Sequence, residues 1–112
     1  MKPLVYIAGP LTHGDRTDNL RAALKAADLV VDAGGVPFVP HLLDTWNLLT
    51  PRSYEDWMAI DFEFVRRADI LWRIPGLSPG ADREFVFACD NGVRAVASES
   101  AMRKAVEEMT RR

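Results

Sequence analysis

Residues 70–84 read ILWRIPGLSPGADRE, in which an apolar run is followed by a turn of small residues and a polar segment. The first five of these residues are typical of a buried strand, and a helix is expected from Arg83 to Asp90. The first N–H groups of a helix have no partner within it, so such a turn is a ready site for an anion. Glu84 follows Gly80 by one helical turn, which places a carboxylate beside the turn. The stretch therefore predicts an anion site flanked by a carboxylate, a pattern that suggests chemistry on a sugar phosphate.

Strand-like and helix-like segments alternate along the whole chain. Short runs of β-forming residues predict four strands, at residues 4–8, 36–39, 70–74 and 93–97. Apolar residues at helical spacing predict four helices: one between a cap at Thr17 or Asp18 and the glycines at 34–35, one from Ser53 to Ala68, one from Arg83 to Asp90, and one that begins at Ser98 or Ser100. Residues 40–51 are expected to form a long loop.

This alternation predicts a parallel sheet covered by helices on both faces. The expected fold class is α/β: a flavodoxin-like or Rossmann-like three-layer sandwich with four to five parallel strands. In such a sheet, ligands bind outside the carboxyl ends of the strands. The residues expected to bind substrate at this edge are Gly9, Pro10, His41, Ser78, Gly80 and Ser98.

Composition and charge narrow the class of protein. The chain has 112 residues, of which 48% are hydrophobic, enough for one compact domain with a modest core. A net charge of −2, with acids and bases mixed, does not resemble the basic stripe that binds a nucleic-acid polymer. No apolar run approaches the roughly 20 residues that cross a bilayer, so a cytoplasmic protein without a membrane partner is expected. The two histidines and Cys89 are spaced too widely for zinc. No metal or cofactor is expected, and Cys89 is expected to be a buried thiol.

Four motifs lie in order on the expected elements: Tyr6-Ile7-Ala8-Gly9-Pro10, Asp61, Ala68-Asp69, and Ser78-x-Gly80-x-x-x-Glu84. Together they resemble the nucleoside 2-deoxyribosyltransferase-like superfamily over residues 4–96. The resemblance implies that residues 1–112 form one domain of this type. It also implies that Glu84 is the nucleophile, that Asp61 contacts the base, and that Tyr6 orients the glutamate.

Within that superfamily, the turn is closest in motif to the branch that hydrolyses 2′-deoxynucleoside 5′-monophosphates. The transferases usually have Asp where Ser78 stands, whereas the hydrolases have Ser, so the resemblance implies that Ser78 and Gly80 hold the 5′-phosphate. Residues 11–15 follow the glycine-rich loop of that branch only loosely. The hydrolases take a further phosphate-binding serine from a neighbouring subunit, which here would be Ser98 or Ser100.

The resemblance also implies a homodimer or larger homo-oligomer with shared active sites. Residues with large side chains that are available for a subunit interface are Trp46, Trp57, Met58, Met102 and Met109.

The predicted reaction is cleavage of the N-glycosidic bond of 2′-deoxynucleoside 5′-monophosphates, with hydrolysis to the free base and deoxyribose 5-phosphate. A carboxylate at the anomeric carbon stabilises the oxocarbenium-like charge and can form a covalent intermediate, as in retaining glycosidases. Glu84 is the candidate for that role, and Asp61 the candidate for protonating the base. Two alternatives remain: a nucleoside 2-deoxyribosyltransferase that exchanges bases between deoxynucleosides, and a non-catalytic nucleotide-binding module.

Structural roles are alternatives for several of these residues. Glu84 could be a first-turn acid that favours the helix dipole, and Tyr6 could be an ordinary core residue. Asp69 is expected to brace the entry of the third strand. Arg73 and Arg83 flank the turn, where each could pair with phosphate or remain a solvated charge.

Overall fold

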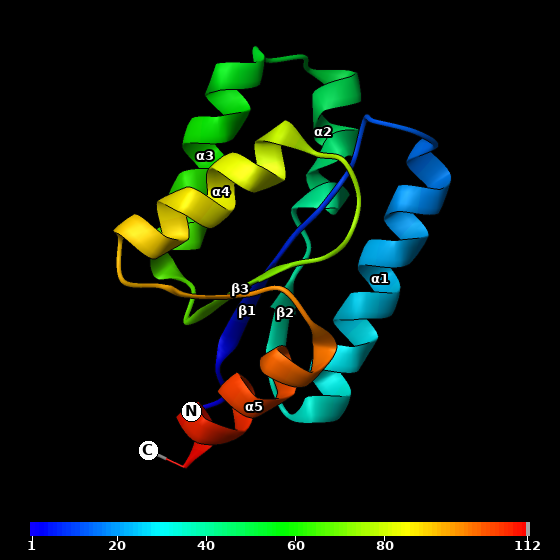
Figure 1. Cartoon of the computed structure of the whole chain (residues 1–112). Helices are drawn as coiled ribbons and strands as arrows, with labels where there is room; N and C mark the ends of the chain where they lie inside the picture. The colour runs from blue at the N-terminus through cyan, green and yellow to red at the C-terminus, as the bar shows by residue number, and fades with distance from the viewer. Residues whose placement is uncertain (112) are drawn as a thin grey trace.

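Four parallel strands pair in the order β2-β1-β3-β4 and carry helices on both faces (Figure 1). The structure is a computed structural model that describes residues 1–111. Its elements are β1 (Leu4–Ala8), α1 (Arg16–Ala33), β2 (Val36–Phe38), the 3₁₀ helix η1 (Pro40–Leu43), α2 (Asp44–Leu49), α3 (Tyr54–Arg67), β3 (Ile70–Arg73), α4 (Pro79–Asp90), β4 (Arg94–Val96) and α5 (Glu99–Thr110). This strand order is the flavodoxin-like one, so the predicted α/β three-layer sandwich is confirmed.

The alternation of side chains along β1 separates two cores. Val5 and Ile7 pack with residues of α1 and α5 on one face of the sheet. Tyr6 and Ala8 point to the opposite face and pack with residues of α3 and α4. Because successive side chains of a strand point to opposite faces, the central strand supplies both cores, and its carboxyl end opens between the two helix layers.

The sequence predicted some helix ends correctly and misplaced others. Gly34 ends α1 in the left-handed conformation, with φ of 96°. Ser53 caps α3 by accepting a hydrogen bond from the backbone N–H of Asp56. The cap of α1 is Asp15, not Thr17 or Asp18: its side chain accepts from the backbone N–H of Asp18, so the helix begins two or three residues earlier than expected.

Two segments are more helical than the sequence predicted. Residues 40–51, expected as a loop, contain η1 and α2. Helix α4 begins at Pro79 rather than Arg83, because Ser78 caps it and the fixed φ of proline suits the first helical position. Pro79 and Gly80 of the predicted turn thereby belong to the first turn of the helix.

Burial contradicts two other expectations. Cys89 is exposed, because it follows the buried Ala88 by one residue and therefore lies about 100° further round the helix. Met58 and Met102 are buried in the chain, so neither is available for the subunit interface for which both were candidates.

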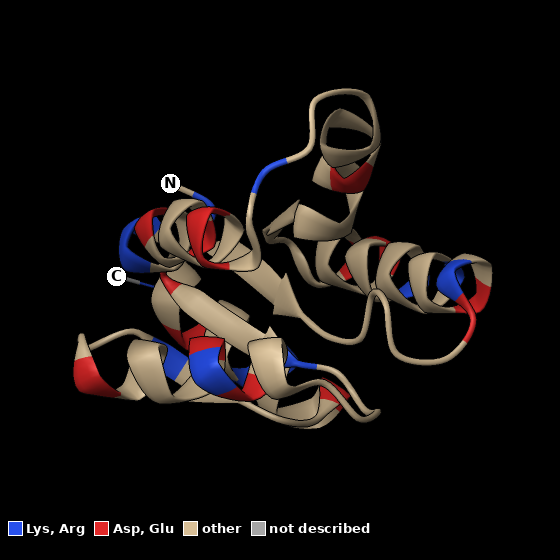
Figure 2. Cartoon of the chain, turned by 90° about the horizontal axis from the view of Figure 1, so that it is seen from above, with Lys and Arg blue, Asp and Glu red and all other residues tan. Residues whose placement is uncertain are grey.

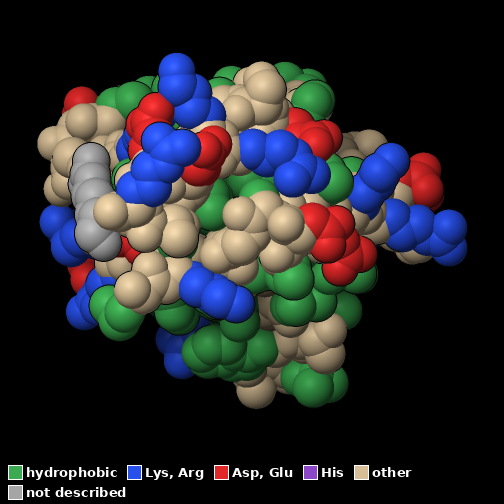
Figure 3. Space-filling view, turned by 90° about the horizontal axis from the view of Figure 1, so that it is seen from below, with side chains coloured by type: hydrophobic (Ala, Val, Ile, Leu, Met, Phe, Trp, Pro, Cys, Tyr) green, Lys and Arg blue, Asp and Glu red, His purple; other side chains and the backbone are tan. Residues whose placement is uncertain are grey.

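Charged side chains of both signs are mixed over residues 1–111 (Figure 2, Figure 3). Basic and acidic positions are interspersed along the helices (Figure 2), and both signs lie among hydrophobic side chains on the face seen from below (Figure 3). Within residues 1–111, no helix has the length and apolarity that a membrane span requires.

Candidate active site

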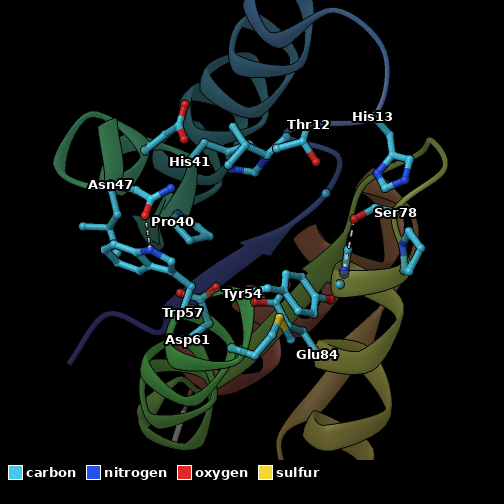
Figure 4. A pocket seen from close by; sticks show the side chains of 18 of the residues that line it. Thr12, His13, Pro40, His41, Asn47, Tyr54, Trp57, Asp61, Ser78 and Glu84 are labelled. Atoms are coloured by element: carbon cyan, nitrogen blue, oxygen red, sulfur yellow. Dashed lines mark hydrogen bonds between the residues drawn. The ribbon is translucent and has the colours of Figure 1, made fainter. Parts of the chain in front are cut away.

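A pocket of about 560 Å³ opens at the carboxyl edge of the sheet. Its walls come from four segments: the loop after β1, the η1–α2 region, α3, and the first turns of α4 (Figure 4). The volume lies within the range of small-molecule sites in proteins. The pocket is therefore where the parallel sheet was expected to bind a ligand.

Glu84 and Asp61 line this pocket, and Tyr6 lies against Glu84. Tyr6 projects from the middle of β1 and is fully buried, and its hydroxyl donates a hydrogen bond to Glu84 Oε2. Glu84 stands on α4 with 5% of its surface exposed. Asp61, on the facing side of α3, is close enough for a hydrogen bond between the two carboxyl groups. Three residues far apart in sequence, all predicted as catalytic, thus form one cluster.

Burial disfavours ionisation of both carboxyl groups. Loss of solvent raises the pKa of Glu84 to about 8, with the nearby Asp61 charge as the second cause. Burial likewise raises the pKa of Asp61, to about 6. The pKa of Tyr6 lies well above its usual value, first because of burial and then because of the Glu84 charge, so its hydroxyl stays a donor. Near neutral pH the carboxyl pair therefore holds one proton.

The first turn of α4 offers fewer free donors than its sequence suggested. Ser78 Oγ accepts a hydrogen bond from the backbone N–H of Ala81 at 3.1 Å, and the Ser78 carbonyl accepts one from the backbone N–H of Asp82 at 3.0 Å. Pro79 has no N–H to donate. The Gly80 N–H finds no acceptor among residues 1–111. The donors left for an anion are thus the Gly80 N–H and the Ser78 hydroxyl proton.

Gly9 and His41 line the wall opposite α4, whereas Pro10, which was also expected to bind substrate, does not line the pocket. A Cβ on Gly9 would lie 2.4 Å from Ile74 Cγ1, so the close packing of the two loops requires glycine there. His41 Nε2 lies 3.0 Å from the Pro10 carbonyl, to which it donates in the matching tautomer. Burial lowers the pKa of His41, so this side chain is a neutral part of the wall.

The structure does not bring every predicted residue to the pocket. Ser98 is exposed and caps α5 through the N–H of Ala101 at 3.1 Å, away from the pocket of its own chain. Arg73 is held by Asp82 and by two carbonyls of the β3–α4 loop. Arg83 pairs with Glu55. These two arginines brace α4, and neither lines the pocket.

Other pocket residues were not among the predicted site residues, and Trp57 was a candidate for a subunit interface or for stacking on a nucleobase. Trp57 precedes Asp61 by four residues, so both lie on one face of α3, and this spacing could have linked them. Tyr54 lies over the first turn of α4, where its hydroxyl would be 3.2 Å from a Cβ on Gly80. Asn47 accepts a hydrogen bond from the Trp57 indole at 2.5 Å, a contact with no sequence signal.

The two ends of the pocket differ in character. Asn47, Trp57 and Asp61 lie on one side of Glu84, and Ser78 and His13 lie on the other (Figure 4). An aromatic ring beside polar groups suits a flat heterocycle, whereas the helix start suits an anion. Among residues 1–111, no three His, Cys, Asp or Glu side chains gather in a way that could hold a metal ion.

A family model described as a domain of unknown function (DUF7768) matches residues 3–98. A search of curated protein sequences finds no match. Among solved structures, a conserved protein from Enterococcus faecalis V583 is similar with a TM-score of 0.74 at 15% identity, over 97% of this chain and 99% of that one.

Two deoxyribosyltransferases also have this fold. A 2-desoxiribosyltransferase from Leishmania mexicana has a TM-score of 0.62 at 20% identity, and the match covers 85% of this chain and 63% of that one. A 2-deoxyribosyltransferase from Bacillus psychrosaccharolyticus has a TM-score of 0.59 at 23% identity, over 82% of this chain and 69% of that one. The expected deoxyribosyltransferase-like fold is thereby confirmed, and this chain spans less than two thirds of the Leishmania protein.

Proposed function

The chain belongs to the family described as a domain of unknown function (DUF7768), and we propose that it cleaves the N-glycosidic bond of 2′-deoxynucleoside 5′-monophosphates by hydrolysis. The observation that carries this proposal is the buried cluster of Tyr6, Asp61 and Glu84 in the pocket. Burying two carboxyl groups side by side is costly, and a pocket that only binds a nucleotide has no use for such a pair.

In the first step, the Glu84 carboxylate attacks C1′ of the deoxyribose. The C1′–N bond breaks, its electron pair leaves with the base, and Asp61 gives its proton to the base. In the second step, water attacks C1′, the bond to Glu84 breaks, and the water proton passes to the Asp61 carboxylate. The products are free base and deoxyribose 5-phosphate, and both carboxyl groups regain their starting state.

The proton of the pair must sit on Asp61 when Glu84 attacks. Burial and the Asp61 charge raise the pKa of Glu84 and so favour the proton on Glu84. The Tyr6 hydroxyl acts in the opposite direction, because its hydrogen bond stabilises the Glu84 anion. The role proposed for Tyr6 is thus to keep the ionised form of Glu84 accessible.

The 5′-phosphate is assigned to the start of α4, where the Gly80 N–H and the Ser78 hydroxyl are free to donate. His13, on the same side of the pocket, adds a further polar group (Figure 4). Deoxyribosyl transfer to a second base is the competing function. It is favoured by the likeness to two deoxyribosyltransferases and by the small number of free donors at α4.

A homo-oligomer with shared sites is also part of the proposal. Exposed leucines at positions 42, 48 and 49 lie on η1 and α2, beside the pocket. Because Ser98 does not line the pocket of its own chain, any contact that it makes with phosphate would have to be with a neighbouring subunit.

The test is a chromatographic assay for free base. The protein is incubated with each deoxynucleoside 5′-monophosphate, with the matching deoxynucleosides, and with and without a second base. We expect base release from the monophosphates and a fall of at least about 10³-fold in Glu84→Ala. Asp90→Asn, an exposed acid at the end of the same helix, is the matched control and should keep full activity.

The other outcomes are equally informative. A new nucleoside that forms only with the second base present would replace hydrolysis by transfer. Tight binding of monophosphates without any turnover would contradict the enzymatic function and leave a nucleotide-binding module.

A further inference from the structure

The amide of Asn47 is held in one orientation by two hydrogen bonds. Its Oδ1 accepts from the indole Nε1 of Trp57 at 2.5 Å and from the backbone N–H of Arg52 at 2.9 Å. Both partners can only donate, so the oxygen must occupy that position. The usual ambiguity between the oxygen and nitrogen of an asparagine amide is thereby resolved.

The Asn47 NH₂ group is consequently turned away from the indole (Figure 4). Asn47 lines the pocket, and no side chain or carbonyl among residues 1–111 accepts a hydrogen bond from its Nδ2. Asn47 therefore offers a hydrogen-bond donor, its NH₂ group, to a ligand at this end of the pocket, and it offers no acceptor there.

A second donor-only group lies beside it. Arg52 also lines the pocket and has no carboxylate partner within residues 1–111. Its guanidinium lies 5.9 Å from the ring centre of Trp46, and Trp46 packs edge-on against Trp57 at 5.0 Å. The aromatic end of the pocket thus carries two groups that donate hydrogen bonds.

We propose that Asn47 selects nucleobases with a carbonyl oxygen at this edge, namely 6-oxopurines and 4-oxopyrimidines, over their 6-amino and 4-amino counterparts. The inference rests on the proposed function for the placement of the base at this end of the pocket. A carbonyl oxygen accepts from the Asn47 NH₂ group, whereas an exocyclic amino group would set two donors against each other and leave both without a partner. The two hydrogen bonds to Asn47 Oδ1 prevent the amide from rotating, so its oxygen cannot face the base instead.

Two matched substrate pairs test this selection: deoxyinosine against deoxyadenosine 5′-monophosphate, and deoxyuridine against deoxycytidine 5′-monophosphate. Members of a pair differ at the exocyclic group and in the protonation of the adjacent ring nitrogen. We expect the wild type to favour the oxo member by about 10-fold or more in kcat/KM. In Asn47→Asp, one carboxylate oxygen keeps both hydrogen bonds and the other faces the pocket as an acceptor, so the preference should be lost or reversed.

Trp57→Phe is the companion variant, because it keeps an aromatic ring but removes one of the two donors that hold Oδ1. The freed amide can then rotate, so selectivity should shrink without reversing. Thermal melting of both variants establishes that they are folded.

Binding of hypoxanthine, adenine, uracil and cytosine, followed by tryptophan fluorescence, separates this inference from the proposed function. If no nucleotide is cleaved but hypoxanthine and uracil bind in preference to adenine and cytosine, the proposed function fails and the role of Asn47 stands. A wild type that shows no oxo preference in either assay overturns the inference. So does a preference that Asn47→Asp leaves unchanged.

Discussion

The two faces of the sheet bury different kinds of side chain, although both draw on β1. Under α1 and α5 the buried residues are all hydrophobic, among them Ile7 and Met102. Under α3 and α4, Tyr6 is hydrogen-bonded to the buried Glu84. Burial of hydrophobic side chains stabilises a fold, whereas burial of carboxyl groups destabilises it. The face under α1 and α5 is therefore expected to stabilise the protein, and the face under α3 and α4 to carry the chemistry.

Met102→Ala is expected to have the largest effect on stability. Met102 is fully buried under α5, and truncating such a side chain costs about 2–4 kcal/mol of unfolding free energy. Base release per folded molecule should not change, because Met102 does not line the pocket. Urea unfolding and the assay at low temperature measure the two quantities.

Lys104→Ala, an exposed change on the same helix, is the control and should shift stability by less than about 0.5 kcal/mol. Loss of base release in folded Met102→Ala would show that the two faces are not separable.

Glu84→Gln is expected to give a smaller, pH-dependent gain in stability. The pKa of Glu84 is raised in the folded state, so its contribution is fully present below the unfolded pKa, near 4.5, and is lost as pH rises toward about 8. Gln does not ionise, and it can still accept from Tyr6 and donate to Asp61. The melting temperature of the variant should therefore exceed that of the wild type by several degrees at pH 8.5, with little difference at pH 5.

Glu63→Gln is the matched control on the same face of the sheet. Glu63 is an exposed acid on α3 whose pKa is lowered, chiefly by its hydrogen bond with Arg67, so its loss cannot stabilise the protein as pH rises. Equal melting curves for Glu84→Gln and wild type at pH 8.5 would contradict a costly ionised Glu84.

The fold could be predicted from sequence because its signals are periodic or local. Alternating β-forming and helical segments fixed the layers, and the glycine and serine caps marked several boundaries. Parallel strands bring their carboxyl ends together, which is why Gly9, His41 and Ser78 could be expected at one edge. The grouping of Tyr6, Asp61 and Glu84 was implied by the resemblance to the nucleoside 2-deoxyribosyltransferase-like superfamily. The short helix α2 was missed because six residues, Asp44–Leu49, are too few for a helical period to be recognised.

The remaining site residues depend on contacts that a sequence does not display. Asn47 gains its role from the indole of Trp57, ten residues later, and from the fold of the intervening turn. Ser98 has the same capping pattern as Ser78, yet only one of the two serines faces the pocket. A serine cap in the sequence therefore predicts where a helix begins, but it does not predict whether that end of the helix lies at the pocket.

The smallest expected effect is that of Tyr6→Phe on the pH dependence of base release. The reaction needs one proton on the carboxyl pair, so kcat/KM in the wild type should rise near pH 6 and fall near pH 8. Phe keeps the packing of the ring but removes the hydrogen bond that favours the Glu84 anion.

The maximum rate of Tyr6→Phe should therefore fall by about 10-fold, and the upper limb should move up by at most about one pH unit. The lower limb should move less, because Tyr6 makes no hydrogen bond to Asp61. A rate profile measured from pH 5 to 9.5 reports both limbs. If neither the maximum nor either limb changed, Tyr6 would act by packing alone, and the chemical face of the sheet would differ from the hydrophobic one only through its two carboxyl groups.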